Sequence, residues 1–200
     1  MHIEKIELQN FRNYKNLELE FSKNVNLILG KNAQGKTNLL EAVYLTAIGR
    51  SFRTSKDLDL VKFNENNAIV KVWAEKELNS TTVEISIKRK GEKSSEKFIK
   101  KDRKNVTKTS QLLKNILIVI FSPEDLKIVK DEPEKRRKFI DRELSQISPK
   151  YYNSLSNYKK SLLQRNTYLK EENLEPSIID LWDIQLAKYG AEVIFLRKEF

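Results

Sequence analysis

Alternation of hydrophobic and polar residues dominates the start of the chain. It runs over residues 3–8 and 17–21, with a polar turn at residues 10–14 between them. A continuous apolar run follows over residues 25–29 and stops at Gly30. Alternation indicates strands with one buried face, whereas a continuous run is typical of a strand buried on both faces. The sequence therefore predicts three strands before Gly30.

The next elements are one helix and a pair of strands. Residues 36–48 carry apolar side chains mainly at helical spacing and stop at a glycine, which predicts a helix with a glycine end. Alternation over residues 68–74 and 82–88 predicts two strands. A turn around Gly91 then predicts an antiparallel hairpin between residues 82–88 and 95–100.

The rest of the chain changes character. The apolar run over residues 116–121 predicts another buried strand, and the Ser-Pro-Glu-Asp sequence at residues 122–125 is typical of a helix start. From Pro133 onward the patterns indicate helices only, with breaks near Pro149 and at residues 173–176.

This change predicts two domains. We expect an α/β domain over residues 1–132 and an all-helical, coiled-coil-like domain, incomplete, over residues 133–200.

Composition excludes several kinds of chemistry. The 200 residues carry a formal net charge of +10 and contain no cysteine, which excludes disulfide scaffolds, zinc ribbons and cysteine nucleophiles. The single histidine, His2, is expected only to contact solvent. No apolar run is long enough to span a membrane, and no basic-then-apolar leader opens the chain. We expect a cytoplasmic protein.

The positive charge is concentrated in residues 88–108, which hold ten Lys or Arg and three Asp or Glu. Such an excess favours a polyanion partner, although a solvated lysine-rich hairpin would show the same pattern. Contacts from this segment to a DNA backbone would be independent of sequence and strongly salt-dependent. The candidate DNA-binding residues here are Lys88, Arg89, Lys100, Lys101, Arg103 and Lys104.

One motif carries clear chemistry, the Walker A phosphate loop G-x-x-x-x-G-K-[ST]. Its residues are Gly30, Lys31, Asn32, Ala33, Gln34, Gly35, Lys36 and Thr37. The glycines allow backbone N–H groups to face a phosphate, Lys36 would reach the β and γ phosphates, and Thr37 would ligate Mg²⁺. The motif follows a predicted apolar strand and opens an apolar helix, the setting that a phosphate loop requires; a glycine-rich turn that binds nothing is the alternative.

The remaining motifs discriminate among phosphate-loop proteins. A GTPase would need N-K-x-D, which the 200 residues lack, and the antiparallel strands fit an ABC-type ATPase head better than a small-molecule kinase. An ABC-type head also needs a Walker B pair of acids directly after an apolar strand. Glu124 and Asp125 are the candidates, but two residues separate them from the apolar run, so a helix-capping role is favoured.

Five stretches together resemble the RecF family of bacterial ATPases, which act in DNA replication and recombinational repair and are related to SMC proteins. They are N-F-R-N-Y at residues 10–14, the phosphate loop with the N-L-L-E-A that follows it at 30–42, G-R-S-F-R at 49–53, F-S-P-E-D-L at 121–126 and P-E-K-R-R-K-F-I-D at 133–141. The resemblance spans essentially the whole chain.

This resemblance implies an α/β fold, the ABC/SMC-type P-loop ATPase head with a mixed sheet and an antiparallel part. It also implies binding of ATP and Mg²⁺, an ATP-dependent homodimer, binding of DNA duplexes and gapped or single-strand junctions, recombination mediator partners and a role in the SOS response. Family members are longer and carry Walker B and the signature motif in their C-terminal part. We therefore expect an N-terminal fragment that does not itself hydrolyse ATP.

Individual roles follow from the same resemblance. Arg12 and Asn13 match positions that touch nucleotide, although Arg12 could be a surface cation. Arg50 and Arg53 match an arginine-bearing loop near DNA or near the phosphates of the dimer; the alternative is a salt bridge to an aspartate, Asp57 or Asp59.

Two other functions stay open on the sequence. One is a phosphotransferase that acts on a small metabolite, which shares the phosphate loop but requires a catalytic acid or base. The other is an interaction fragment that works without nucleotide.

Overall fold

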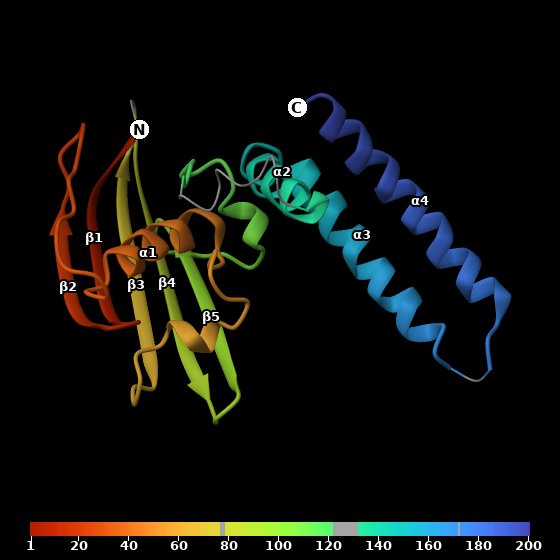
Figure 1. Cartoon of the computed structure of the whole chain (residues 1–200), viewed down its shortest axis with the longest axis horizontal. Helices are drawn as coiled ribbons and strands as arrows, with labels where there is room; N and C mark the ends of the chain where they lie inside the picture. The colour runs from red at the N-terminus through yellow and green to blue at the C-terminus, as the bar shows by residue number, and fades with distance from the viewer. Residues whose placement is uncertain (77–78, 122–131, 172) are drawn as a thin grey trace. The chain divides into compact units, whose positions relative to one another are not determined.

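The structure is a computed structural model, and it describes residues 1–76, 79–121, 132–171 and 173–200 (Figure 1). The chain forms two compact units, Met1–Ile118 and Val119–Phe200. The expected domain boundary at residue 132 stays a prediction. Within the described part of the chain, no helix combines the length and the apolar character that crossing a membrane would need.

The first unit is built on a six-stranded antiparallel sheet with strand order β2-β1-β3-β4-β5-β6. The strands are β1 (His2–Phe11), β2 (Tyr14–Glu20), β3 (Asn67–Glu75), β4 (Ser80–Lys90), β5 (Ser94–Lys101) and β6 (Lys104–Asn105). The predicted hairpin is confirmed, because Lys88 pairs with Glu96 across a turn in which Gly91 has φ 77°.

Helix α1 (Lys36–Ile48) lies across one face of this sheet (Figure 1). The face that it covers carries the apolar residues of the alternating strands: Ile6, Leu8, Val70, Val72, Val83, Ile85 and Ile87. The helix ends as predicted, because Gly49 adopts φ 78° and its N–H donates to the Leu45 carbonyl oxygen at 2.7 Å. Two short 3₁₀ helices, η1 (Asp57–Leu60) and η2 (Thr109–Gln111), complete the elements of this unit.

The opposite face of the sheet is polar. Successive side chains of a strand point to opposite faces, so the residues between the buried ones face away from α1. Among them, the Lys71 ammonium lies 4.4 Å from the Trp73 ring centroid, and Lys100 lies 3.7 Å from the Glu84 carboxylate. This face therefore carries lysines that contact acids and aromatic rings.

Both predictions of a strand buried on two faces are wrong. Residues 25–29 and 117–121 have no strand structure, and Val25 and Val119 are 86% and 81% exposed. A strand that is apolar on both faces needs hydrogen-bonded neighbours and cover on both sides, and neither run has a strand partner among the described residues. The helix start expected at residues 122–125 lies outside the described residues.

The described part of the second unit contains α2 (Pro133–Ile147), α3 (Pro149–Tyr168) and α4 (Pro176–Lys198). Each helix begins at the proline that the sequence indicated. Leu144, Tyr151, Leu155 and Val193 form its apolar core. The Tyr151 hydroxyl bonds to Asp141 and accepts from Arg197, and burial together with Asp141 raises the pKa of Tyr151 to about 12. That these helices make a separate domain stays a prediction.

Candidate nucleotide-binding site

The phosphate loop joins residue 29 to α1 through backbone conformations that favour glycine. Gly30 has φ 150° and Gly35 has φ 106°, and Ala33 between them is left-handed at 65°. A Cβ at Gly35 would lie 2.7 Å from the side-chain amide of Asn13 and 3.0 Å from the Tyr14 hydroxyl. Glycine is therefore required at position 35 both for its φ and for this close approach.

The start of α1 presents an anion site. The first turn of the helix contains no acidic residue, so its free N–H groups and the positive end of the helix dipole are not neutralised there. The Lys36 ammonium donates to the carbonyl oxygens of Gly30 at 2.5 Å and Lys31 at 2.8 Å, folding back over the loop. A phosphate group would offer this ammonium a stronger, charge-assisted partner.

The turn between β1 and β2 supports the loop from outside. Asn13 Nδ2 donates to the Gln34 carbonyl oxygen at 3.0 Å, and the Tyr14 hydroxyl donates to the Gly35 carbonyl oxygen at 3.1 Å. Burial raises the pKa of Tyr14, so this hydroxyl keeps its proton. Asn13 thus lies beside the phosphate loop, and its contact with nucleotide stays a prediction. Tyr14 was missed, because an aromatic residue in a turn gives no specific signal.

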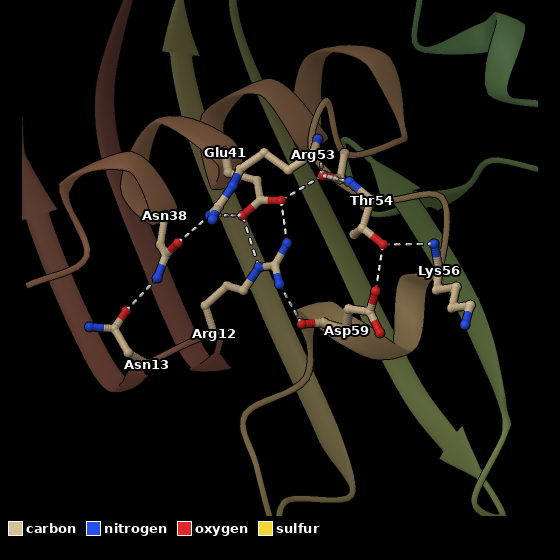
Figure 2. A network of polar contacts seen from close by, with 9 residues as sticks. Arg12, Asn13, Asn38, Glu41, Arg53, Thr54, Lys56 and Asp59 are labelled. Atoms are coloured by element: carbon tan, nitrogen blue, oxygen red, sulfur yellow. Dashed lines mark hydrogen bonds and ion pairs between the residues drawn. The ribbon is translucent and has the colours of Figure 1, made fainter. Parts of the chain in front are cut away.

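A buried carboxylate lies one turn further along α1. Glu41 is fully buried, and Arg12 binds both of its oxygens, with Nε to Oε2 at 2.9 Å and Nη2 to Oε1 at 2.6 Å (Figure 2). Ser51 Oγ donates to Oε1 at 2.5 Å, and Arg53 Nη1 to Oε2 at 3.2 Å. We call these four residues the Glu41 cluster. It joins the first turn, the phosphate-loop helix and the loop after that helix.

Electrostatics keeps Glu41 ionised. Burial alone would raise the pKa of this carboxyl, but hydrogen bonds from Arg12 and Ser51 and the charges of Arg12 and Arg53 outweigh burial and lower the pKa. Sequence reasoning missed Glu41 as a functional residue. The signal was one acid among the apolar residues that the helix buries, where an ion is found only when it is paired.

The Glu41 cluster changes the interpretation of both predicted arginines. Arg12 is not a surface cation, because its third donor, Nη1, bonds to the Asp59 carbonyl oxygen at 2.9 Å. Arg53 does not pair with either expected aspartate: Asp57 pairs with Lys97 at 2.8 Å, and Asp59 accepts a hydrogen bond from a threonine hydroxyl. For Arg53 the salt-bridge alternative therefore named the wrong acids, and for Arg50 it stays open. Contacts of Arg12 with nucleotide and of Arg53 with DNA stay predictions.

The loop that carries Arg50 and Arg53 borders a pocket of about 530 Å³. Hydroxyl-bearing side chains of the same loop and of η2 also line the pocket, and Lys97 of β5 reaches it from the sheet. The Lys97 ammonium donates to the Gly49 carbonyl oxygen at 2.9 Å, which fixes the end of α1. Cations from two parts of the chain therefore meet around this pocket.

The basic residues of the segment 88–108 are spread out, in contrast to the cations around this pocket. Lys88 and Lys100 lie on the face of the sheet away from α1, while Arg89 Nε donates to the Glu65 carbonyl oxygen at 3.3 Å. Arg103 occupies the β5–β6 turn with φ 66°. The remaining candidates, Lys101 and Lys104, pair with each other across that turn. The candidate DNA residues are therefore distributed over the sheet and do not form one cluster.

Metal coordination by Thr37 stays a prediction, although its exposed hydroxyl at the start of α1 suits the oxygen preference of Mg²⁺. The Walker B candidates Glu124 and Asp125 lie outside the described residues. His2 does more than contact solvent, because its Nε2 lies 3.3 Å from Glu75 Oε2. Glu4 completes a group with metal-ligand spacing there, but Lys23 at 3.5 Å already pairs with Glu75.

The geometry defines a P-loop ATPase fold: a glycine-rich loop that opens a helix on an antiparallel sheet. The chain belongs to the AAA domain family, whose model matches residues 5–193. It is similar to curated proteins named DNA replication and repair protein RecF. One from Clostridium tetani is 46% identical over 100% of this chain and 54% of its own length; one from Clostridioides difficile is 44% identical over 100% and 53%. The chain thus spans about half the length of these relatives.

Solved structures agree. A RecF-ATP structure, described as the recombination mediator protein in the RecFOR pathway, matches with TM-score 0.90 and 40% identity over 99% of this chain and 53% of that one. A structure from a study of ATP-driven dimerization and DNA-stimulated activation of SMC ATPases matches with TM-score 0.55 and 24% identity over 70% of this chain and 98% of that one, which shows the fold alone. The resemblance to RecF and the ABC/SMC-type fold are confirmed, but the sheet is antiparallel in every described pairing and not mixed as the resemblance implied.

Proposed function

We propose that this chain binds ATP through residues 30–37 and serves DNA replication and recombinational repair. The observation that carries the proposal is the phosphate loop at the start of α1, where Lys36 meets two loop carbonyls and the first turn has no acid. Similarity to RecF proteins over the whole chain supports the biological setting. The setting favours a cytoplasmic protein that acts in the response to DNA damage, including the SOS response.

Each residue of the loop has a defined task in this proposal. Backbone N–H groups at the start of α1 hold phosphate oxygens, and Lys36 exchanges its two carbonyl partners for the β and γ phosphates. The Thr37 hydroxyl holds Mg²⁺, which neutralises phosphate charge when it is bound. Asn13 and Tyr14 hold the loop carbonyls and so keep the N–H groups directed at the ligand.

DNA is the proposed polyanion, as duplex and at gapped or single-strand junctions. Arg50 and Arg53 beside the 530 Å³ pocket, and Lys88 and Lys100 on the sheet, are the proposed backbone contacts. Such contacts provide affinity without base readout. We also propose recombination mediator proteins as partners, because a similar structure is described as a recombination mediator in the RecFOR pathway. An ATP-dependent homodimer of the whole protein is proposed from the resemblance to the RecF family.

Hydrolysis is assigned to the longer protein. RecF relatives are about twice as long as this chain, and we propose that Walker B and the signature motif lie in the part of those proteins that it does not span. The 200 residues are then a nucleotide-binding piece without hydrolytic activity of its own. No observation favours a metabolite phosphotransferase.

Titration calorimetry of Mg-ATP into the wild type and Lys36→Ala tests the proposal. Loss of charge-assisted hydrogen bonds worth about 1.5–3 kcal/mol should weaken binding by roughly 10- to 150-fold. Lys71→Ala is the matched control, since it removes a lysine from the face of the sheet away from α1 and outside the phosphate loop. Equal affinities for the wild type and Lys36→Ala, or no binding by the wild type, would refute ATP binding through this loop.

A further inference from the structure

A chain of side-chain hydrogen bonds leads from Arg53 to the phosphate loop. Arg53 Nη1 donates to Asn38 Oδ1 at 2.7 Å, and Asn38 Nδ2 donates to Asn13 Oδ1 at 2.8 Å (Figure 2). Asn13 Nδ2 in turn donates to the Gln34 carbonyl oxygen at 3.0 Å. Three successive bonds therefore connect an arginine of the loop after α1 with the backbone of the phosphate loop.

Of the two arginines that bind Glu41, Arg53 can change partners more readily. It is held to Glu41 at 3.2 Å and to the neutral Asn38, and its side chain is 43% exposed. Arg12, by contrast, binds both oxygens of Glu41 and is 19% exposed. A phosphate oxygen makes a stronger hydrogen bond with an arginine than a neutral amide does, so an arriving phosphate would displace Asn38 before it displaced Glu41.

Asparagine is suited to the middle of such a chain. Its amide accepts from Arg53 through oxygen and donates to Asn13 through nitrogen, whereas an aspartate could only accept. Asn38 and Glu41 are three residues apart on α1, which places both on the same side of the helix. When Arg53 leaves, Asn38 loses the partner that orients its amide, and its bond to Asn13 is no longer held in one direction.

We propose that Asn38 is a positioning residue that couples anion binding at Arg53 to the conformation of the phosphate loop. The inference rests on the proposed function, because it takes ATP as the ligand of residues 30–37 and DNA phosphate as the ligand of Arg53. Glu41 is the fixed point, since it retains Arg12 while Arg53 exchanges Asn38 for phosphate. Coupling of this kind is reciprocal, so ATP raises DNA affinity by the factor by which DNA raises ATP affinity.

The test measures that factor directly. Affinity for a short fluorescent duplex is determined by anisotropy with and without Mg-ATP, and affinity for Mg-ATP by calorimetry with and without duplex. We expect the wild type to show a coupling factor of at least about 5, at the lower end of typical allosteric values. Asn38→Ala should reduce this factor to less than about 2 while each ligand alone binds with nearly unchanged affinity.

Matched variants separate coupling from folding. Asn16→Ala removes an asparagine from the face of the sheet away from α1 and should keep the wild-type factor. Asn38→Asp keeps an acceptor for Arg53 but no donor for Asn13, so it should also lose coupling. Melting temperatures of all variants should match that of the wild type, because Asn38 is only partly buried and alanine is favourable in a helix.

The results distinguish the two proposals. Wild-type coupling that survives in Asn38→Ala would overturn the role of Asn38. A wild type that binds ATP and duplex independently would overturn the inference and leave ATP binding intact. A wild type that binds no ATP would overturn both.

Discussion

Two positively charged regions of the first unit are built in opposite ways. Around Glu41, two arginines and a serine converge on one fully buried carboxylate with contacts of 2.5–3.2 Å. In the basic segment over residues 88–108, by contrast, lysines pair with acids that are not buried, as Lys100 does with Glu84 at 3.7 Å and Lys90 with Glu96 at 3.0 Å. The first region has fewer charges, which are anchored on one buried carboxylate; the second has more charges and no buried anchor.

The difference shows that charge density and charge placement report different properties. A surplus of exposed lysines creates an electrostatic field that attracts a polyanion, and salt readily screens this field. A buried carboxylate with two arginines fixes the geometry of three chain segments, because an ion that loses its partners in the interior is very costly. Charge density can be read from the sequence, whereas the placement of the charges cannot.

The largest expected effect comes from removing the buried charge. Glu41→Ala leaves Arg12 and Arg53 without their acceptor inside the fold, and loss of one partner of a buried pair typically costs about 3–5 kcal/mol. Glu84→Ala is the matched variant on the open sheet, where an exposed pair contributes less than about 1 kcal/mol. Urea unfolding followed by circular dichroism measures both. Comparable losses for the two variants would show that the regions do not differ energetically.

A pair of glycines extends the comparison to the backbone. Gly35 in the phosphate loop and Gly91 in the turn of the basic hairpin both have positive φ, at 106° and 77°. Alanine at either position incurs a strain of about 1–2 kcal/mol. At Gly35 the new Cβ would also displace the Asn13 amide from Gln34, which adds about 0.5–1.5 kcal/mol, whereas nothing lies within 4 Å at Gly91.

Thermal unfolding of Gly35→Ala and Gly91→Ala gives the two losses side by side. Gly35→Ala should melt several degrees lower than Gly91→Ala, as expected for an added 1 kcal/mol or so in a domain of about 100 residues. A Gly91→Ala variant that melts at or below the temperature of Gly35→Ala would contradict the role given to Asn13 in holding the loop.

Local pattern was sufficient for the elements whose partners are close in the chain. The helix over residues 36–48 was found to the residue, because helical spacing and the glycines at its two ends are local signals. The hairpin around Gly91 was found for the same reason. The predictions of strands at residues 25–29 and 116–121 were wrong. Apolar residues indicate that a segment tends to be buried, but they do not identify the neighbouring strand with which it would pair.

The candidate site likewise contains one part that local sequence signals predict and another part that they do not. The phosphate loop was identified by residue spacing and its place before a helix. The resemblance implied a contact of Asn13 with nucleotide but not the hydrogen bond by which Asn13 holds the loop. Glu41 gave only a weak signal, an acid among apolar residues of the helix, because its partners are 29, 12 and 10 residues away and a single acid in a helix is most often solvated. Contacts between residues that are far apart in the chain cannot be predicted from a single sequence without relatives.

The smallest effect concerns the ionisation of Glu41 and depends on pH. Since its pKa is lower in the folded chain than its ordinary value of 4.5, the ionised carboxylate stabilises the fold above about pH 4.5, and this contribution is lost as pH falls through the folded pKa. Glu41→Gln keeps the shape of the side chain but cannot ionise. The difference in unfolding free energy between wild type and Glu41→Gln should therefore be constant near neutral pH and shrink below about pH 4.5.

Because the pair is buried, the neutral-pH difference should persist in high salt, where exposed pairs on the sheet are screened. If added salt abolished this difference in unfolding free energy, the Glu41 pair would be screened like the exposed lysine pairs. The contrast between the two regions would then be wrong.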